Sequence, residues 1–452
     1  MKNKKKNDTN KNDSRGKVFR TNMHMNTNKR IGFIAAAILL LAVVGVATTY
    51  LLFPYDPLKP PEAYDEGSTI EGMEELVNAN NKFSFDMLYK MNGDALNEMG
   101  RENVFYSPYS IFSALAITYE GARGDTAQEM KGVFYFPESD VLRPNYAAIY
   151  NMINAENKSY ELRTGNALWV QEDFRLLDEY TGDVEKYYGG KAANLDFSGD
   201  TEEARNTINS FIEQQTNNRI EDLIPEGVLS RDTKLVLTNA IYFKGSWKYE
   251  FDPDKTVEED FWISEEESVK ADMMHMSPDE ARFNYFENDE VQMIELPYED
   301  DELSMIIMLP KERLEDVGHL LNNEDFCDLK SQMQETKIDS IYLPRFKFET
   351  KYMMKNQLAD MGMPLAFTDA ADFSGMTGGR DLMIADVIHQ AFVEVNEEGT
   401  EAAAATGVVM MPTSAGPVDK TIFRADKPFV FIIQENETGS ILFKGQVNDP
   451  SQ

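Results

Sequence analysis

The chain offers few side chains for nucleophilic, acid–base or metal chemistry. It has four histidines, His24, His275, His319 and His389, and a single cysteine, Cys327. Cys327 has no Cys or His neighbour at zinc-ligand spacing, and acidic clusters such as ENDE lack the central Gly of a calcium loop. No GxSxG elbow, HExxH helix, P-loop or GxGxxG turn is present. We therefore expect no enzyme, no metal site and no cofactor.

His389 is the histidine whose surroundings in the sequence say most about its role. It lies among apolar residues of the strand-like stretch Ala385–Gly399, where a hydrogen-bonded core histidine is the expected role. A Ser-His-Asp triad remains the enzymatic alternative, because the members of a triad need not be adjacent in the chain.

The segment Ala402–Val418 is distinguished by its lack of charge. With 27% charged residues in the chain, these seventeen positions should hold four or five charges, and they hold none. In a strand, alternate residues face the same side, so Glu401 would face away from the uncharged set. That set is Thr400, Ala402, Ala404, Thr406, Val408 and Met410. Pro412, Gly416 and Pro417 instead favour an exposed loop.

These two characters together predict a segment that is a loop in one state and a strand in another. The strand-like stretch Ala385–Gly399 runs directly into it. The segment would either continue the direction of that strand or fold back beside it as a new strand. Exposed segments that can pair with a sheet are normally aggregation hazards, so a functional reason is expected.

The chain resembles the serpin family at several ordered motifs. HQAFVEVNEEGTEAAAAT is similar to the proximal hinge of the serpin reactive-centre loop. Four further stretches match serpin motifs: NVFYSPYSIFSALAITYEGARGDTAQEM (Asn103–Met130), TNAIYFKGSWKYEF (Thr238–Phe251), GMPLAFTDAADFSGMTG (Gly362–Gly378) and FRADKPFVFIIQENETGSILFKGQVNDP (Phe423–Pro450). The resemblance covers about Phe83 to Pro450. It implies an α+β serpin fold with three β-sheets, eight or nine helices and an exposed reactive-centre loop.

The resemblance also implies a function, namely suicide-substrate inhibition of serine or cysteine proteases. The protease attacks the exposed loop and forms an acyl-enzyme ester. The cut loop then inserts into the main sheet before water can release the enzyme. Small, uncharged hinge residues permit fast insertion, which favours an inhibitor over a non-inhibitory serpin with a binding or structural role. The expected hinge comprises Glu397, Glu398, Gly399, Thr400, Glu401, Ala402, Ala403, Ala404, Ala405 and Thr406.

The position of the reactive bond also follows from the resemblance. Counting sixteen positions beyond Glu397 places it at Thr413–Ser414. Counting back from Phe423 points to Ala415 instead, and Met410–Met411 is a further alternative. No Arg or Lys lies in the loop centre. We therefore expect elastase-, chymotrypsin- or subtilisin-like target proteases.

Two further groups of residues match serpin positions that control sheet opening. A polar cluster would hydrogen-bond across the strands that must part, which makes His389 structural. This cluster comprises Ser107, Ser110, Asn239 and His389. Trp247 and Glu397 match the point where the loop first inserts.

The N-terminal region differs in composition from the rest of the chain. Residues 1–30 hold ten Lys or Arg and two acids, and Ile31–Phe53 carries no charge over 23 residues. About 20 apolar residues span a bilayer, and the basic flank indicates a cytoplasmic tail at 1–30. We expect a single-pass anchor in the cell membrane at 31–53, with the serpin domain outside. The alternative is a signal peptide cleaved near Gly45-Val46-Ala47, which would give a secreted protein.

The composition of the rest of the chain indicates how its domains are arranged and which partners are unsuitable. Residues 54–70 are rich in proline and acids and indicate an extended linker, and 71–452 would form the serpin domain. The formal net charge of −34 at pH 7 argues against nucleic acid as a partner. A single cysteine excludes an intramolecular disulfide, and we expect a monomer.

Overall fold

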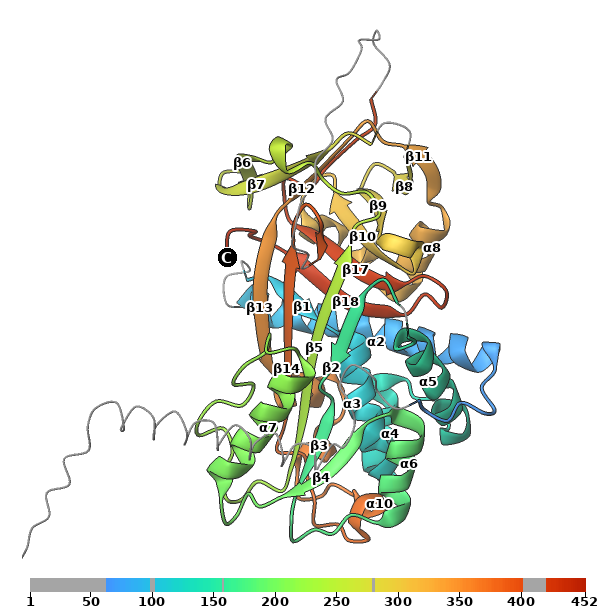
Figure 1. The fold of residues 1–452 in the computed structure, drawn as a ribbon, viewed down its shortest axis with the longest axis vertical. Helices are drawn as coiled ribbons and strands as arrows, with labels where there is room; N and C mark the ends of the chain where they lie inside the picture. The colour runs from blue at the N-terminus through green and yellow to red at the C-terminus, as the bar shows by residue number, and fades with distance from the viewer. Residues whose placement is uncertain (1–61, 98–101, 157, 279–280, 401–419) are drawn as a thin grey trace, which may run out of the picture. The chain divides into compact units, whose positions relative to one another are not determined.

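A computed structural model of the chain describes residues 62–97, 102–156, 158–278, 281–400 and 420–452 (Figure 1). The expected α+β fold with three β-sheets is confirmed, and the described ranges contain nine α-helices.

The α-helices are α2 (Ile70–Asn97), α3 (Pro108–Gly121), α4 (Gly124–Phe134), α5 (Ser139–Ile153), α6 (Asp178–Tyr188), α7 (Thr201–Gln215), α8 (Asn323–Ser331), α9 (Lys355–Met361) and α10 (Ser374–Thr377). Four short 3-10 helices accompany them: η1 (Pro253–Lys255), η2 (Glu299–Asp301), η3 (Leu314–Leu320) and η4 (Pro364–Phe367).

The predicted basic tail (1–30), the predicted membrane segment (31–53) and residues 54–61 of the predicted linker lie outside the described residues. Within the described part of the chain, no helix has the length and apolar character needed to cross a bilayer.

The strands form three β-sheets, called the hinge sheet, the core sheet and the small sheet. The hinge sheet has the strand order β13 (Phe346–Met353), β14 (Asp386–Val395), β15 (Gly399–Thr400), β5 (Leu235–Ser246), β3 (Ala167–Gln171) and β4 (Lys191–Leu195), with β2 (Glu161–Thr164) also paired to β5. The core sheet has the order β1 (Val104–Tyr106), β18 (Ile441–Val447), β17 (Phe429–Glu435), β10 (Leu303–Pro310), β9 (Val291–Pro297), β8 (Arg282–Glu287) and β11 (Gln334–Lys337). The small sheet has the order β16 (Ile422–Arg424), β12 (Ser340–Pro344), β7 (Ser268–Met276) and β6 (Val257–Trp262).

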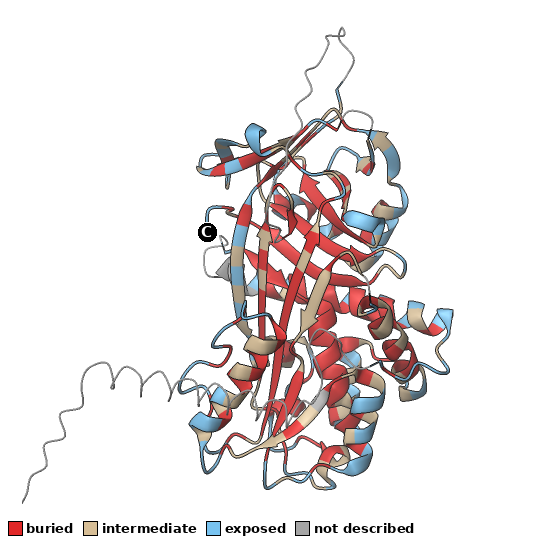
Figure 2. Ribbon diagram, viewed as in Figure 1, coloured by how far each residue is buried: buried red, intermediate tan, exposed pale blue. Residues whose placement is uncertain are grey.

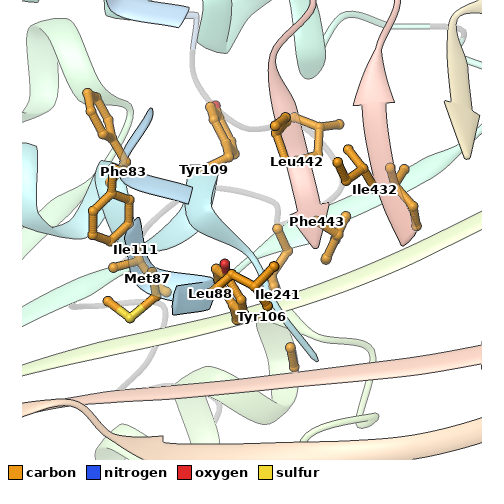
Figure 3. Close-up of a cluster of buried hydrophobic side chains, with 14 of the residues drawn as sticks. Phe83, Met87, Leu88, Tyr106, Tyr109, Ile111, Ile241, Ile432, Leu442 and Phe443 are labelled. Carbon is orange, nitrogen blue, oxygen red and sulfur yellow. The ribbon is translucent and has the colours of Figure 1, made fainter. Parts of the chain in front are cut away.

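The core sheet contains the most deeply buried strands. Every residue of β10, β17 and β18 is buried (Figure 2), which agrees with the nearly continuous apolar sequences of β10 and β17. Side chains from β17 and β18 lie in the same cluster as residues of α2 and β5. Figure 3 labels Phe83, Met87, Ile241, Ile432, Leu442 and Phe443 among them. These side chains pack the core sheet together with α2 and with β5 of the hinge sheet.

Helix α2 shows how local periodicity leads to packing. Its apolar residues recur every three or four positions, so they share one face of the helix. The five residues of this repeat are buried: Leu76, Ala79, Phe83, Met87 and Met91. Polar residues on α2 then tie it to the core sheet, because the Asn80 side-chain amide donates to the carbonyl of Ile441.

One expected strand is divided by the structure. The alternation in residues 340–350 predicts a single half-exposed strand. Instead, β12 ends at Pro344 in the small sheet, and β13 starts at Phe346 in the hinge sheet. Arg345 lies between them, and its amide donates to the carbonyl of Asp272 at 2.7 Å. The alternation is compatible with either arrangement, and only the pairing partners decide where one sheet ends.

The centre of the hinge sheet is the pair β5 and β14. The two strands run parallel, with direct pairing from Asp386↔Val236 to Ala391↔Ile241 (Figure 1). Beyond Ala391 the direct pairing stops, and β15 lies between the ends of the two strands. The hinge sheet is therefore closed along one half of this pair and holds an extra strand in the other.

Candidate functional site

The predicted hinge begins with a tight reversal of the chain after β14. The Asn396 amide donates to the carbonyl of Gly399 at 2.9 Å. The Asn396 side chain also accepts from the amides of Glu398 and Gly399 at 3.0 and 3.2 Å. Asn side chains commonly stabilise turns in this way. Of the two alternatives left open by the sequence, Gly399 and Thr400 follow the one in which the chain folds back beside the strand.

After this turn, β15 occupies the space between β14 and β5. Thr400 pairs antiparallel with Val395 of β14 and with Gly245 of β5. Gly399 must be glycine here, because a Cβ at this position would lie 2.1 Å from the carbonyl oxygen of Gly245. Thr400 is only 2% exposed. Hinge residues Gly399 and Thr400 are thus already a strand of the sheet.

The side chain of Thr400 meets a buried aromatic group. Its hydroxyl lies 2.7 Å from the hydroxyl of Tyr298, which follows β9 of the core sheet. The ring of Tyr298 stacks on Trp247 with 4.6 Å between centroids, and it meets Phe243 edge to face at 5.3 Å. Burial raises the pKa of Tyr298 well above its usual value, so the phenol stays protonated.

Trp247 also holds the backbone of the turn. Its amide donates to the carbonyl of Glu398 at 2.8 Å, and its indole N–H donates to the carbonyl of Asn396 at 3.0 Å. The amide of Phe251 donates to the carbonyl of Glu397 at 2.9 Å. The end of β5 and the residues after it therefore bind three consecutive carbonyls of the turn.

Glu397 fixes the same turn through its carboxylate. The residue is 5% exposed, and one carboxylate oxygen lies 2.5 Å from both the Arg345 guanidinium and the Thr256 hydroxyl. Burial by itself would raise the pKa of Glu397, but the hydrogen bonds from Thr256 and Arg345 outweigh it and lower the pKa below its usual value. Since Arg345 lies between β12 and β13, this ion pair ties the turn to the junction of the hinge and small sheets.

The polar cluster expected beneath the sheet is brought together by the structure. His389 and Asn239 are aligned on the parallel strands β14 and β5, and the His389 Nδ1 contacts the Asn239 side-chain oxygen. The Ser107 amide donates to His389 Nε2 at 3.2 Å, and the Asn239 side-chain amide donates to the Ser110 hydroxyl at 2.7 Å. The four residues are buried and link the N-terminal end of α3 to both central strands.

The hydrogen bonds define the charge state of His389. Nε2 accepts from a backbone amide, so the proton of the neutral ring must reside on Nδ1. Burial lowers the pKa of His389 to about 3, which keeps the ring neutral. With both nitrogens occupied by an amide and by Asn239, His389 is not available as a general base. The Ser107 hydroxyl is likewise occupied, because it donates to the carbonyl of Leu442 at 2.6 Å.

Asn166 completes this cluster and was missed by the sequence reasoning. Its side-chain oxygen accepts from Asn239 at 2.6 Å and from Ser110 at 2.8 Å. It lies at the break between β2 and β3, directly after Gly165. A Gly-Asn pair between two strand-like runs is the signal that could have identified this irregularity.

The other candidate residues contribute little to this site. Cys327 and His319 are exposed on α8 and η3. No group of three or more His, Cys, Asp or Glu in the described ranges could hold a metal ion. The remaining hinge and reactive-bond residues lie outside the described part of the chain: Glu401, Ala402, Ala403, Ala404, Ala405, Thr406, Met410, Met411, Thr413 and Ser414.

Comparisons with known proteins agree with this geometry. The family model described as "Serpin (serine protease inhibitor)" matches residues 78–450. An uncharacterised serpin-like protein of Methanosarcina acetivorans is 43% identical over 381 residues, covering 83% of this chain and 88% of that protein. The human leukocyte elastase inhibitor is 36% identical over 386 residues, covering 84% of this chain and 100% of that protein. The solved structure of human thyroxine-binding globulin has a TM-score of 0.73 at 27% identity, covering 84% of this chain and all of that one.

Proposed function

The chain belongs to the serpin family, and from this we propose that it inhibits extracellular serine proteases by suicide-substrate trapping. The protease cleaves the reactive-centre loop, stays bound to it as an acyl ester, and is trapped when the loop inserts between β14 and β5. Serpin loop insertion is an established example of strand addition to a sheet. Cysteine proteases, which form the analogous thioester, are a second target class for the same mechanism.

The observation that carries this proposal is the position of Thr400. It already lies between the two central strands, buried and paired on both sides. The loop residues that follow on the same face in the expected register are uncharged, and the first three, Ala402, Ala404 and Thr406, are small, so they can enter the sheet without burying a charge. A hinge with this composition supports an inhibitor over a binding protein.

The register of β15 indicates the order in which insertion would proceed. Thr400 pairs with Gly245, so each further loop residue advances one position along β5 in the opposite direction. Continuing this register brings Thr406 between Asn239 and His389. Insertion must therefore separate the two residues that now bridge the strands.

The composition of the loop supports the choice of target protease. The absence of Arg and Lys between Ala402 and Val418 disfavours trypsin-like enzymes. The similarity to the leukocyte elastase inhibitor favours elastase-like enzymes, and we extend this to chymotrypsin- and subtilisin-like ones. We place the reactive bond at Thr413–Ser414, with Met410–Met411 as the alternative.

Incubation of the purified full chain with elastase or subtilisin tests the proposal. We expect a covalent complex that survives boiling in detergent, together with a released C-terminal peptide. Mass spectrometry of this peptide identifies the reactive bond. Cleavage without any complex would contradict inhibition.

A non-inhibitory role is the second candidate, and the similarity to thyroxine-binding globulin favours it. In that case the cut loop would not trap the enzyme, although it could still be cleaved. Rapid cleavage with complete recovery of protease activity would support this candidate.

We propose that the serpin domain acts outside the cell as a monomer. The support for an anchor is the uncharged stretch Ile31–Phe53 after a basic tail. Fractionation of cells that produce the full chain tests it. Recovery with the membranes supports the anchor, and recovery in the medium supports cleavage of a signal peptide.

A further inference from the structure

Tyr298 is held rigidly in the structure at the point where the hinge enters the sheet. Its amide donates to the carbonyl of Leu303 at 3.0 Å, and it forms an isolated β-bridge with Trp247. Its ring is fixed between Trp247 and Phe243, and the residue is 1% exposed. The phenol therefore has little freedom to reorient.

The hydroxyl of Tyr298 points to a single partner. Within the described residues, its only hydrogen bond is the one to the Thr400 hydroxyl, at 2.7 Å. Gly245 makes this approach possible, because a Cβ there would lie 3.0 Å from the Tyr298 ring. If Thr400 left the sheet, the Tyr298 hydroxyl would lose this hydrogen bond, which is unfavourable.

This contact bears on how insertion starts. Where β14 and β5 pair directly, separating them breaks backbone hydrogen bonds before the entering strand can form new ones. Extending a strand that is already in place replaces each pair as it proceeds. The direct pairing of β14 and β5 ends at Ala391↔Ile241, and β15 occupies the end of the sheet beyond it. Insertion can therefore begin from an open position.

We propose that Tyr298 is a positioning residue for the trapping reaction, holding Thr400 in the sheet so that insertion is already nucleated when a protease arrives. This inference rests on the proposed function. In this proposal Tyr298 acts through the hinge, by its hydrogen bond to Thr400. Losing its hydroxyl lets the hinge leave the sheet, so that more of the cut loops release the protease before they insert.

The test compares Tyr298→Phe, Thr400→Val and the double variant in the full chain. Tyr180→Phe is the matched control, because it removes a buried hydroxyl that donates to the carbonyl of Ile117 on α3. The first readout is the number of inhibitor molecules consumed per elastase trapped. The second, without protease, is amide hydrogen exchange of residues 397–400.

We expect Tyr298→Phe to raise the number of molecules consumed roughly threefold, as for loss of one hydrogen bond, and to speed hinge exchange by a similar factor. Tyr180→Phe should leave both unchanged. The double variant should be affected less than the sum of the single variants, because both substitutions remove the same bond. Wild-type values for Tyr298→Phe, or full additivity, would overturn the inference.

Failure of the proposed function gives a different result. If the wild-type chain traps no protease, inhibition is ruled out, and hinge exchange alone decides the role of Tyr298. Faster exchange in Tyr298→Phe but not in Tyr180→Phe would then still establish that Tyr298 holds the hinge. A melting measurement on each variant identifies any general loss of folding.

Discussion

The two halves of the β5–β14 pair are held in different ways. In the half next to the hinge, β15 lies between the strands, and Tyr298 and Trp247 hold it there. In the other half, the strands pair directly, and His389 bridges to Asn239 beneath them. The first half already accepts a strand, and the second excludes one until its own contacts break.

This difference separates starting from completing an insertion. The hinge half needs side chains that can be buried, so its requirement is small size and no charge. In the half that carries His389 and Asn239, the cluster half, the strands stay together only if every buried polar group is paired, so this half depends on a complete hydrogen-bond network. In the same sheet, one half already holds an inserted strand, and in the other half the direct pairing of β5 and β14 opposes insertion. The following substitutions test each half.

The largest effect is expected from a charge in the hinge half. Thr400→Arg places a guanidinium where the residue is 2% exposed and 2.7 Å from Tyr298, which costs on the order of several kcal/mol. Trapping should be lost almost completely, leaving a substrate that elastase cleaves and releases. The control is Glu401→Arg, on the opposite face in the expected register, which should still trap. Normal trapping by Thr400→Arg would show that the predicted facing is wrong.

The next effect concerns the cluster half. His389→Leu leaves the Ser107 amide and the Asn239 side chain buried without their partner, which should lower the free energy of unfolding by about 3 kcal/mol. The urea midpoint at pH 7.5 measures this loss. His319→Leu, at an exposed histidine, should change the midpoint hardly at all. Equal urea midpoints for the two variants would show that the hydrogen bonds of His389 do not stabilise the paired strands.

The stability difference between wild type and His389→Leu should depend on pH. Burial lowers the pKa of His389 to about 3, below its unfolded value near 6.5, so the neutral ring stabilises the fold fully above pH 6.5. As pH falls from 6.5 toward 3, this contribution declines by about 1.4 kcal/mol per pH unit. Urea midpoints at pH 7.5, 6 and 5 should therefore converge for the two proteins. A constant difference would contradict a buried neutral histidine.

The smallest effect is expected at the turn before the hinge. Glu397→Gln removes the ion pair to Arg345 but leaves a guanidinium that is partly exposed, so the loss should be about 1 kcal/mol. Hydrogen exchange of residues 397–400 should accelerate accordingly. Glu394→Gln is the control, because its ion pair with Lys347 is more exposed and worth little. A larger effect from Glu394→Gln would reverse this assignment.

Much of the fold and part of the site could be predicted from local pattern. The periodicity of α2 and the apolar runs of β10 and β17 identified buried elements, since burial on one face imposes a repeat on the sequence. Strand parity predicts that Thr400 shares a face with Ala402, and Thr400 is buried, while Ala402 lies outside the described residues. The division at Arg345 could not be predicted, because an alternating pattern does not say which sheet a strand joins.

By itself, the sequence determined the family, the uncharged segment Ala402–Val418 and the apolar face of helix α2, because these follow from neighbours along the chain. Only the tertiary structure decided that the chain reverses at Asn396, that Tyr298 meets Thr400, and that Asn166 joins Asn239. Tyr298 and Thr400 are 102 residues apart and Asn166 and Asn239 are 73 apart, and no periodicity links them. Packing of β5 against its neighbours brings these residues together, and where they are buried away from water, their polar groups must hydrogen-bond to each other.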